Sequence, residues 1–93
     1  MNKYESVIII NPTVDEENMK ALVSRYTDLI NGDGKVEKVD ELGKKTLAYK
    51  VKKFEEGFYT VFHFEANPSL ITELERNFRI SDEIIKFMTI KKD

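Results

Sequence analysis

The side chains best suited to chemistry in this chain stand in an aromatic run, EEGFYTVFHF, at residues 55–64. One common RNA-binding module begins its stacking platform with a glycine and alternating aromatic residues on a strand. In that signature a basic residue precedes the glycine, and the stacking rings follow one and three positions after it. Here Glu56 occupies the basic position and Thr60 occupies the second ring position. The run therefore departs from the RNA-stacking signature at two of its defining positions.

A strand places successive side chains on opposite faces, which separates the aromatic residues of this run. Phe58, Phe62 and Phe64 share one face, whereas Tyr59 and His63 share the other. Burying three phenylalanines would stabilise the fold by several kcal/mol, at roughly 25 cal/mol per Å² of apolar surface. We therefore predict that the phenylalanine face packs against helices and that Tyr59 and His63 lie on an open face of the sheet.

Few other groups could support catalysis or bind a metal. His63 is the only histidine and the chain has no cysteine, so one imidazole could offer a metal at most a single nitrogen. The Gly-x-Gly in NGDGK, residues 31–35, follows a predicted helix instead of opening one, so phosphates would meet no helix N-terminus there. No P-loop, nucleophile elbow or zinc motif is present. The sequence predicts no enzyme activity, no metal site and no cofactor.

Lysines form the second set of chemically useful side chains. They fall on the second predicted strand and its turn (Lys44, Lys45, Lys50, Lys52 and Lys53), on or after the last strand (Lys86, Lys91 and Lys92) and at the entry to the first (Lys3). The chain carries 15 basic and 17 acidic groups, and this net charge of −2 counts mildly against nucleic-acid binding. Residues 84–93 nevertheless hold three lysines against one aspartate. A basic edge is one interpretation, and a solvated charged surface is the other.

The elements that must position these side chains are expected in the order β-α-β-β-α-β. Apolar runs and helical spacing predict a strand at 4–12, a helix at 13–32, a long strand or an imperfect hairpin at 35–54, a strand at 55–66, a helix after Pro68 and a strand at 84–91. Thr13 and Glu16 have the spacing of a capping box, and Gly32 is the expected C-cap of the first helix. The alternation breaks at 41–43, which predicts a bend or bulge, and Gly57 is expected in a turn.

Two helices in this order on one antiparallel sheet make the split βαβ, or ferredoxin-like, arrangement. We predict an α+β fold: a ferredoxin-like β-α-β-β-α-β sandwich with a four-stranded antiparallel sheet and two helices on one face. At 93 residues, without repeats or a linker, the chain is expected to form a single domain over 1–93. It shows no secretory signal and no apolar run near the ~20 residues of a membrane span, so we expect a cytoplasmic protein with no membrane partner.

Four segments carry a resemblance that covers nearly the whole chain in order. They are KYESVIIINP, SRYTDLING, GKVEKVDELGKKTLAYKVKK and EEGFYTVFHFEANPSLITELERNFRISDEIIKFMTIKK. The most telling residues are Tyr4-Glu5, Asn11-Pro12, Gly43 with Leu47-Ala48-Tyr49, and Phe78-Arg79-Ile80. In these segments the chain resembles the bacterial small-subunit ribosomal protein S-six family. The resemblance is more specific than any single motif because it extends over the full length.

The resemblance implies a ferredoxin-like fold and a structural role in the ribosome, with no DNA as partner. Members of the family bind 16S ribosomal RNA in the central domain of the small subunit, together with ribosomal protein S-eighteen, with which they form a heterodimer. Carried over by position, the residues expected to contact RNA are Lys3, Tyr4, Arg79, Lys86, Lys91 and Lys92. Lysine and arginine neutralise phosphates, and a tyrosine can stack or hydrogen-bond.

The expected open face of the sheet is apolar enough to favour a covering partner. It would carry Val7, Ile9, Tyr59, Val61, Met88 and Ile90. We expect S-eighteen to cover part of this face or of the edge of the second strand, through Tyr59, Val61, Met88, Lys44 and Lys45. Family members often have arginine after the LG and in the last strand. Lysine at those positions keeps the charge but lacks the two-pronged fork of arginine.

Two other functions are compatible with the residues. A small ferredoxin-like ligand-binding domain or enzyme of the acylphosphatase type would need an arginine-bearing phosphate loop between the first strand and helix, where this chain has NPTVDE. A protein–protein adaptor without RNA contact would be distinguished by its salt dependence. Phosphate contacts make the affinity for RNA fall steeply with ionic strength.

Overall fold

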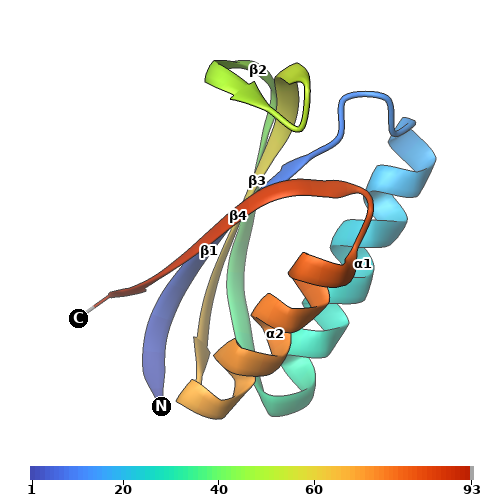
Figure 1. The fold of residues 1–93 in the computed structure, drawn as a ribbon. Coiled ribbons are helices and arrows are strands. Elements are labelled where there is room, and N and C mark those ends of the chain that lie inside the picture. Colours follow the sequence, from blue (N-terminus) through green and yellow to red (C-terminus); the bar gives the residue numbers. More distant parts are fainter. Residues whose placement is uncertain (93) are drawn as a thin grey trace.

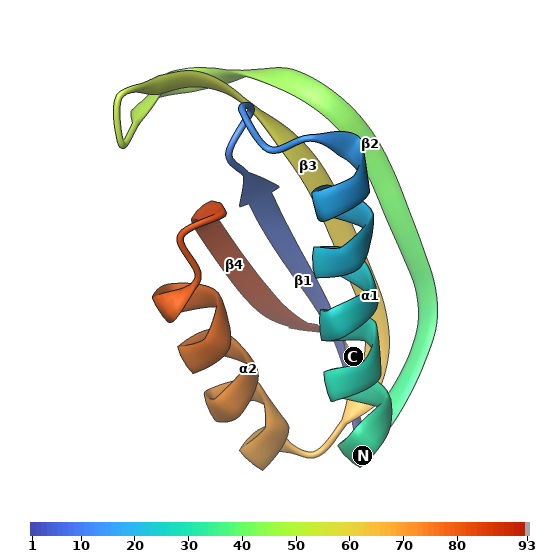
Figure 2. The same cartoon turned by 90° about the vertical axis from the view of Figure 1, so that its right-hand side faces the viewer.

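The computed structural model describes residues 1–92, and its elements follow the predicted order. They are β1 (Asn2–Ile10), α1 (Glu16–Asp33), β2 (Gly34–Val51), β3 (Phe54–Ala66), α2 (Pro68–Ile80) and β4 (Ile84–Lys92). The four strands form one sheet in the order β2-β3-β1-β4, and every neighbouring pair is antiparallel. Both helices cover the same face of the sheet (Figure 1, Figure 2). The predicted ferredoxin-like fold is confirmed, and β2 and β4 are its two edge strands.

The core lies between the sheet and the two helices. Phe62 and Phe64 of β3 are fully buried, as predicted, and they pack with residues of both helices: Leu22, Tyr26, Ile30, Leu70, Leu74 and Phe78. Phe58, nearer the start of β3, is only partly buried at the margin of this core. Tyr59 and His63 point to the other side and are also partly buried. The aromatic run is therefore a core strand with one open face, as its alternation predicted.

The start of α1 differs from the prediction. Asp15, and not Thr13, is the N-cap, and its side chain accepts a hydrogen bond from the backbone N–H of Asn18 at 3.3 Å. Thr13 is occupied elsewhere, since its N–H and its hydroxyl both donate to Oδ1 of Asn11, at 2.8 and 2.7 Å. A side chain that closes the preceding turn in this way competes with capping. At the other end the helix continues through Gly32 to Asp33.

The hairpin of β2 and β3 also differs from the prediction at its tip. The turn falls at Lys52 and Lys53, which have φ values of 49° and 73°, and Gly57 lies inside β3. A Cβ atom at Gly57 would collide with the Cγ2 methyl of Ile9, so the glycine allows close approach of β3 to β1 instead of making a turn. The bend expected at 41–43 is confirmed: the ladder shifts between Glu41 and Gly43.

A second, smaller apolar cluster fixes how the hairpin tip curls. Leu47 of β2, Ile9 of β1 and Ile85 of β4 are buried together, and Val51, Phe54 and Tyr59 pack around them. Beyond Thr46 the regular pairing of β2 with β3 is interrupted until Val51. The tip therefore leaves the plane of the sheet and curls over its end, at the top of Figure 1. This curl brings Lys52 of the turn near the start of β4.

Candidate nucleic-acid interface

The pairing of β1 with β4 decides which basic residues meet. The strands are antiparallel, with Lys3 opposite Lys92 and Tyr4 opposite Lys91. Lys3 and Lys92 therefore lie together on the open face, at the end of the sheet where the two termini are found (Figure 1). Lys86 lies six residues back along β4, roughly 20 Å away at about 3.4 Å per residue. The predicted RNA-binding lysines thus lie at two separate places: Lys91, Lys92 and the facing Lys3 at the C-terminal end of β4, and Lys86 near its N-terminal end.

Lys92 at the C-terminal end of β4 and the facing Lys3 of β1 each contact a carboxylate. Nζ of Lys92 lies 2.6 Å from Oε1 of Glu5, and Nζ of Lys3 lies 3.6 Å from Oε2 of Glu37. The hydrogen bond from Lys92 is the main reason why the pKa of the Glu5 carboxyl lies below its ordinary value, while partial burial opposes this shift. The charge on both lysines is locally compensated within the protein.

These contacts continue across the open face as a chain of polar side chains. Oδ2 of Asp40 on β2 lies 2.9 Å from Nε2 of His63 on β3, and Nδ1 of His63 lies 3.6 Å from Oε1 of Glu5 on β1. Because an ionised carboxylate can only accept, His63 must donate from Nε2 to Asp40. This bond, with a further contribution from Lys38, lowers the pKa of Asp40 against the opposing effect of burial.

The position of His63 in this chain agrees with the prediction of a half-exposed strand histidine: its side chain is 29% exposed. Among residues 1–92, no group of three or more histidine, cysteine, aspartate or glutamate side chains is arranged to hold a metal ion. His63 links Asp40 and Glu5 within this network of surface contacts.

Tyr4, expected to contact RNA by stacking or hydrogen bonding, has its ring turned away from the open face. Tyr4 faces the helices, is only 8% exposed and stacks on Phe64 with ring centroids 5.7 Å apart. The reason is strand parity, because Lys3 and Tyr4 are adjacent and must point to opposite faces. Its hydroxyl accepts a hydrogen bond from the side chain of Asn2 at 3.3 Å. The ring belongs to the core and is not available to a base.

The two basic residues near the N-terminal end of β4 are held by aromatic rings. The guanidinium of Arg79, in the last turn of α2, lies 5.9 Å from the centroid of the Phe87 ring. Nζ of Lys86 lies 5.2 Å from the centroid of Tyr49 and donates to its hydroxyl at 3.3 Å. No ion pair within residues 1–92 involves either cation. A ring face attracts a cation without neutralising its charge.

The sequence places Lys52 at the turn of the second predicted strand but indicates no role for it. The curl of the hairpin places Lys52 beside the start of β4, where it lines a hollow with residues of α2 and β4. The only signal in the sequence is the run of lysines at 50, 52 and 53. That run shows a basic tip but does not show where the tip lies.

The residues expected to bind the partner divide into two groups. Tyr59, Val61 and Met88 share the open face with Val7 and Ile90, and Met88 is 57% exposed. Lys44 and Lys45 are instead on β2, at the opposite edge of the sheet from β4. Nζ of Lys44 lies 5.5 Å from the centroid of the Phe58 ring, which belongs to the face covered by helices. The lysine pair and Met88 therefore do not form one patch.

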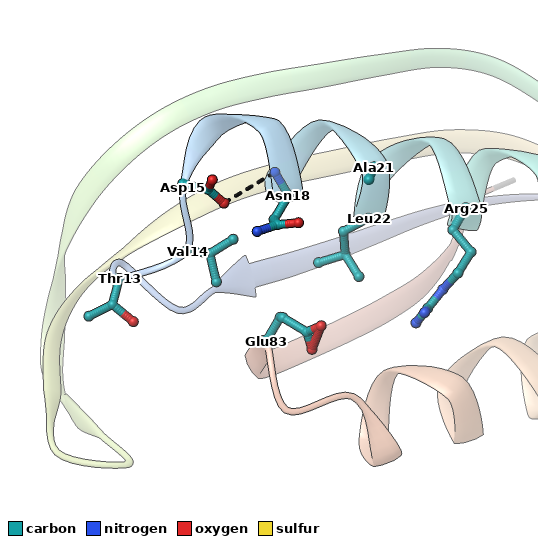
Figure 3. A pocket seen from close by; sticks show the side chains of 8 residues that line it. All are labelled: Thr13, Val14, Asp15, Asn18, Ala21, Leu22, Arg25 and Glu83. Carbon is teal, nitrogen blue, oxygen red and sulfur yellow. Dashed lines mark hydrogen bonds between the residues drawn. The ribbon is translucent and has the colours of Figure 1, made fainter.

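A hollow of about 630 Å³ lies between α1 and the segment that precedes β4 (Figure 3). Arg25 of α1 and Glu83 extend into it from opposite sides. Asp15 occupies the helix N-terminus with its own carboxylate, so an anion would meet negative charge there. The hollow therefore lacks the cationic phosphate loop that an acylphosphatase-type site requires.

No helix within residues 1–92 is long and apolar enough to span a membrane.

Comparisons with known proteins agree over the whole chain. The ribosomal protein S6 family model matches residues 3–91. The small ribosomal subunit protein bS6 of Clostridium botulinum is 49% identical over 94 residues, which cover 100% of each chain. The protein of that name from Clostridium beijerinckii is 47% identical over 93 residues, 99% of this chain and 98% of that protein.

A solved structure shows the same fold. The crystal structure of 30S ribosomal protein S6 from Thermotoga maritima aligns with a TM-score of 0.93 and 40% sequence identity, over 98% of this chain and 87% of that one. The family match, the full-length relatives and the shared sheet order lead to one conclusion. The chain belongs to the ribosomal protein S6 family, a family of small-subunit ribosomal proteins and not of enzymes.

Proposed function

We propose that this protein binds the central domain of 16S ribosomal RNA in the cytoplasm, together with ribosomal protein S-eighteen, and acts as one domain over residues 1–93. The observation that supports RNA contact best is the distribution of cations along β4. Lys86, Lys91 and Lys92 lie on this edge strand, Arg79 lies in the last turn of the helix before it, and β4 itself contains no acidic residue. An edge strand has one uncovered side, so long basic side chains along it can reach phosphates.

The open face supports the proposal of a protein partner. Met88 and Ile90 are 57% and 44% exposed, and partly buried Val7 and Val61 continue the apolar surface inward. Exposed apolar groups that adjoin one another favour cover by another protein. We infer that S-eighteen contacts the Met88 side of this face. Lys44 and Lys45, at the other edge, are a separate candidate contact.

The RNA contact is tested by titrating a central-domain 16S ribosomal RNA fragment with this protein, with and without S-eighteen, at 50 and 200 mM salt. We expect binding that requires the partner and weakens steeply with salt, because cations on the protein release counterions from phosphates. A second outcome is that the protein binds S-eighteen and yet leaves the salt dependence of RNA binding by S-eighteen unchanged. That result would make this protein an adaptor without RNA contact.

The partner contact is tested with Met88→Lys. A charge placed in an apolar interface must be desolvated, so we expect at least a tenfold loss of affinity for S-eighteen, measured by isothermal titration calorimetry. Ile80→Lys is the matched control, since Ile80 is 71% exposed but ends α2, on the helix side of the sheet. Unchanged affinity of Met88→Lys would remove the open face from the interface.

A further inference from the structure

One polar side chain from each of the four strands contacts its neighbour in a single row across the open face. The row follows the spatial order of the strands, from Asp40 on β2 through His63 on β3 and Glu5 on β1 to Lys92 on β4. The nitrogen and oxygen of the three successive contacts are 2.9, 3.6 and 2.6 Å apart. Glu5 and His63 are also directly opposite each other in the pairing of β1 with β3. These four residues form what we call the cross-strand row.

Both ring nitrogens of His63 face a carboxylate. Nε2 donates to Oδ2 of Asp40, so in the neutral ring Nδ1 carries no hydrogen and turns a lone pair toward Oε1 of Glu5. A protonated imidazole has a hydrogen on each nitrogen, which makes Nδ1 a donor to Glu5 as well. The arrangement therefore gives the neutral ring one hydrogen-bond partner and the protonated ring two.

The charged groups near this ring come from all four strands. The carboxylates of Glu5 and Asp40 contact the ring itself. The two nearby cations contact those carboxylates instead: Nζ of Lys38 lies 3.4 Å from Oδ1 of Asp40, and Lys92 donates to Glu5. Glu65 lies two residues further along β3, on the same face of the sheet. A positive charge on the ring thus has a carboxylate on either side of it, one from β1 and one from β2.

We propose that the cross-strand row is a pH-sensitive latch, in which protonated His63 holds Asp40 and Glu5 at once and so ties β2 to β1 across β3. The unfolded chain lacks both contacts, so protonation strengthens the folded state alone. The free energy of unfolding should therefore rise as the pH falls from 8 to 6, the range in which a histidine takes up its proton. This inference concerns the isolated protein and does not depend on RNA or S-eighteen.

The two carboxyl groups remain ionised throughout that range. The hydrogen bond from Lys92 holds the pKa of Glu5 below its ordinary value, and the hydrogen bond from His63 does the same for the pKa of Asp40. Between pH 6 and pH 8 the ring is therefore the one member of the cross-strand row whose charge changes.

The composition of the chain allows this proton to be isolated, since His63 is the only histidine and there is no cysteine. The experiment measures urea unfolding of the unchanged protein and of His63→Gln at pH 8 and pH 6. Glutamine can still donate to Asp40 but cannot take up a proton. Relative to this variant, the ratio of folded to unfolded protein should rise by about two- to fivefold in the unchanged protein, the size expected of an exposed ion pair.

A matched pair of variants tests whether Glu5 is the second partner. Glu5→Gln removes the carboxylate that protonated His63 would gain, so most of the rise should disappear. Glu37→Gln removes a carboxylate that contacts Lys3 and lies outside the cross-strand row, so it should keep the full rise.

Nitrogen NMR of the unchanged protein reads the ring directly. At pH 8 we expect a hydrogen on Nε2 and none on Nδ1, and the Nδ1 signal should move to the protonated position as the pH falls to 6. A neutral ring with its hydrogen on Nδ1 would overturn the latch. So would an equal or opposite response of stability to pH in the unchanged protein and His63→Gln, or a full rise in Glu5→Gln.

Discussion

The two ends of β4 carry the same kind of side chain in opposite electrical settings. At its C-terminal end, Lys92 and the neighbouring Lys3 each contact a carboxylate. Toward its N-terminal end, Arg79 and Lys86 lie over aromatic rings and have no carboxylate partner within residues 1–92. The identity of a basic residue on the edge strand therefore does not tell whether its charge is available to a phosphate.

The difference has an energetic consequence for RNA binding. A phosphate that approaches Lys92 must compete with Glu5, whereas one that approaches Lys86 meets only a ring and a hydroxyl. Exposed ion pairs contribute little to stability, about 0–1 kcal/mol, but they lower the local positive potential. We infer that the N-terminal end of β4 attracts RNA more strongly than the C-terminal end does.

The largest expected effect is a loss of stability when Phe78, which is buried beneath the N-terminal end of β4, is replaced. Phe78 is fully buried, packs edge-on against Tyr26 at 4.8 Å between centroids, and lines the hollow at the start of β4. Phe78→Ala leaves a cavity, so the free energy of unfolding should fall by about 3–5 kcal/mol. Urea denaturation followed by circular dichroism measures this loss.

The control for this prediction lies at the other end of β4. Ile90 is 44% exposed, and Ile90→Ala should change the free energy of unfolding by no more than about 0.5 kcal/mol. If the two variants lost similar stability, the N-terminal end of β4 would not be anchored in the core.

The fold could be predicted from the sequence because few arrangements of strands and helices satisfy its pattern of apolar residues. The period of two in the aromatic run requires Phe62 and Phe64 to share a face, and two amphipathic helices need an apolar surface to cover. The same rule places Tyr4 and Lys3 on opposite faces of β1. It does not say which face is buried, because Ile8 and Ile9 are adjacent and both apolar, so the sequence allows either face of β1 to pack against the core.

The division of the cations could not be predicted, because it depends on distances set by tertiary structure. Lys52 reaches the hollow only because the pairing of β2 with β3 is interrupted beyond Thr46. Glu5 reaches Lys92 only in the observed register of β1 against β4. Sequence spacing gives neither the interruption nor the register. It could therefore name candidate cations but not their partners.

A smaller effect is expected when a charge at the C-terminal end is released. Glu5→Gln removes the negative charge that faces Lys92 while keeping the size of the side chain. The lysine then becomes available, so affinity for the RNA fragment should rise and the slope of log K against log salt should steepen by about one. The same titration with S-eighteen measures both quantities.

Glu16→Gln provides the matched control for that release. Glu16 pairs with Lys20 at 3.3 Å on the exposed surface of α1, away from β4, so freeing Lys20 should leave RNA binding unchanged. A Glu5→Gln variant with the same slope as the unchanged protein would show that Lys92 does not face RNA. The C-terminal end of β4 would then carry its lysines for the charge network alone.

The smallest expected effect is the loss of stability at low pH, when Glu5 and Asp40 take up protons and their contacts with Lys92 and His63 weaken. The hydrogen bonds from Lys92 and His63 hold the pKa values of Glu5 and Asp40, respectively, below their ordinary values. The unfolded chain therefore binds more protons than the folded one as the pH falls below about 4.5, near the ordinary carboxyl values. The stabilisation is complete at neutral pH and is lost as the pH falls through the lowered pKa values.

A double variant, Glu5→Gln with Asp40→Asn, should remove this part of the pH dependence. We expect its urea midpoint to fall less between pH 7 and pH 3 than that of the unchanged protein, because neither substituted side chain can take up a proton. An equal fall in both proteins would mean that other carboxylates dominate acid unfolding. In that case the ion pairs at the C-terminal end would weaken RNA binding without adding measurable stability, which would make the contrast between the two ends of β4 purely functional.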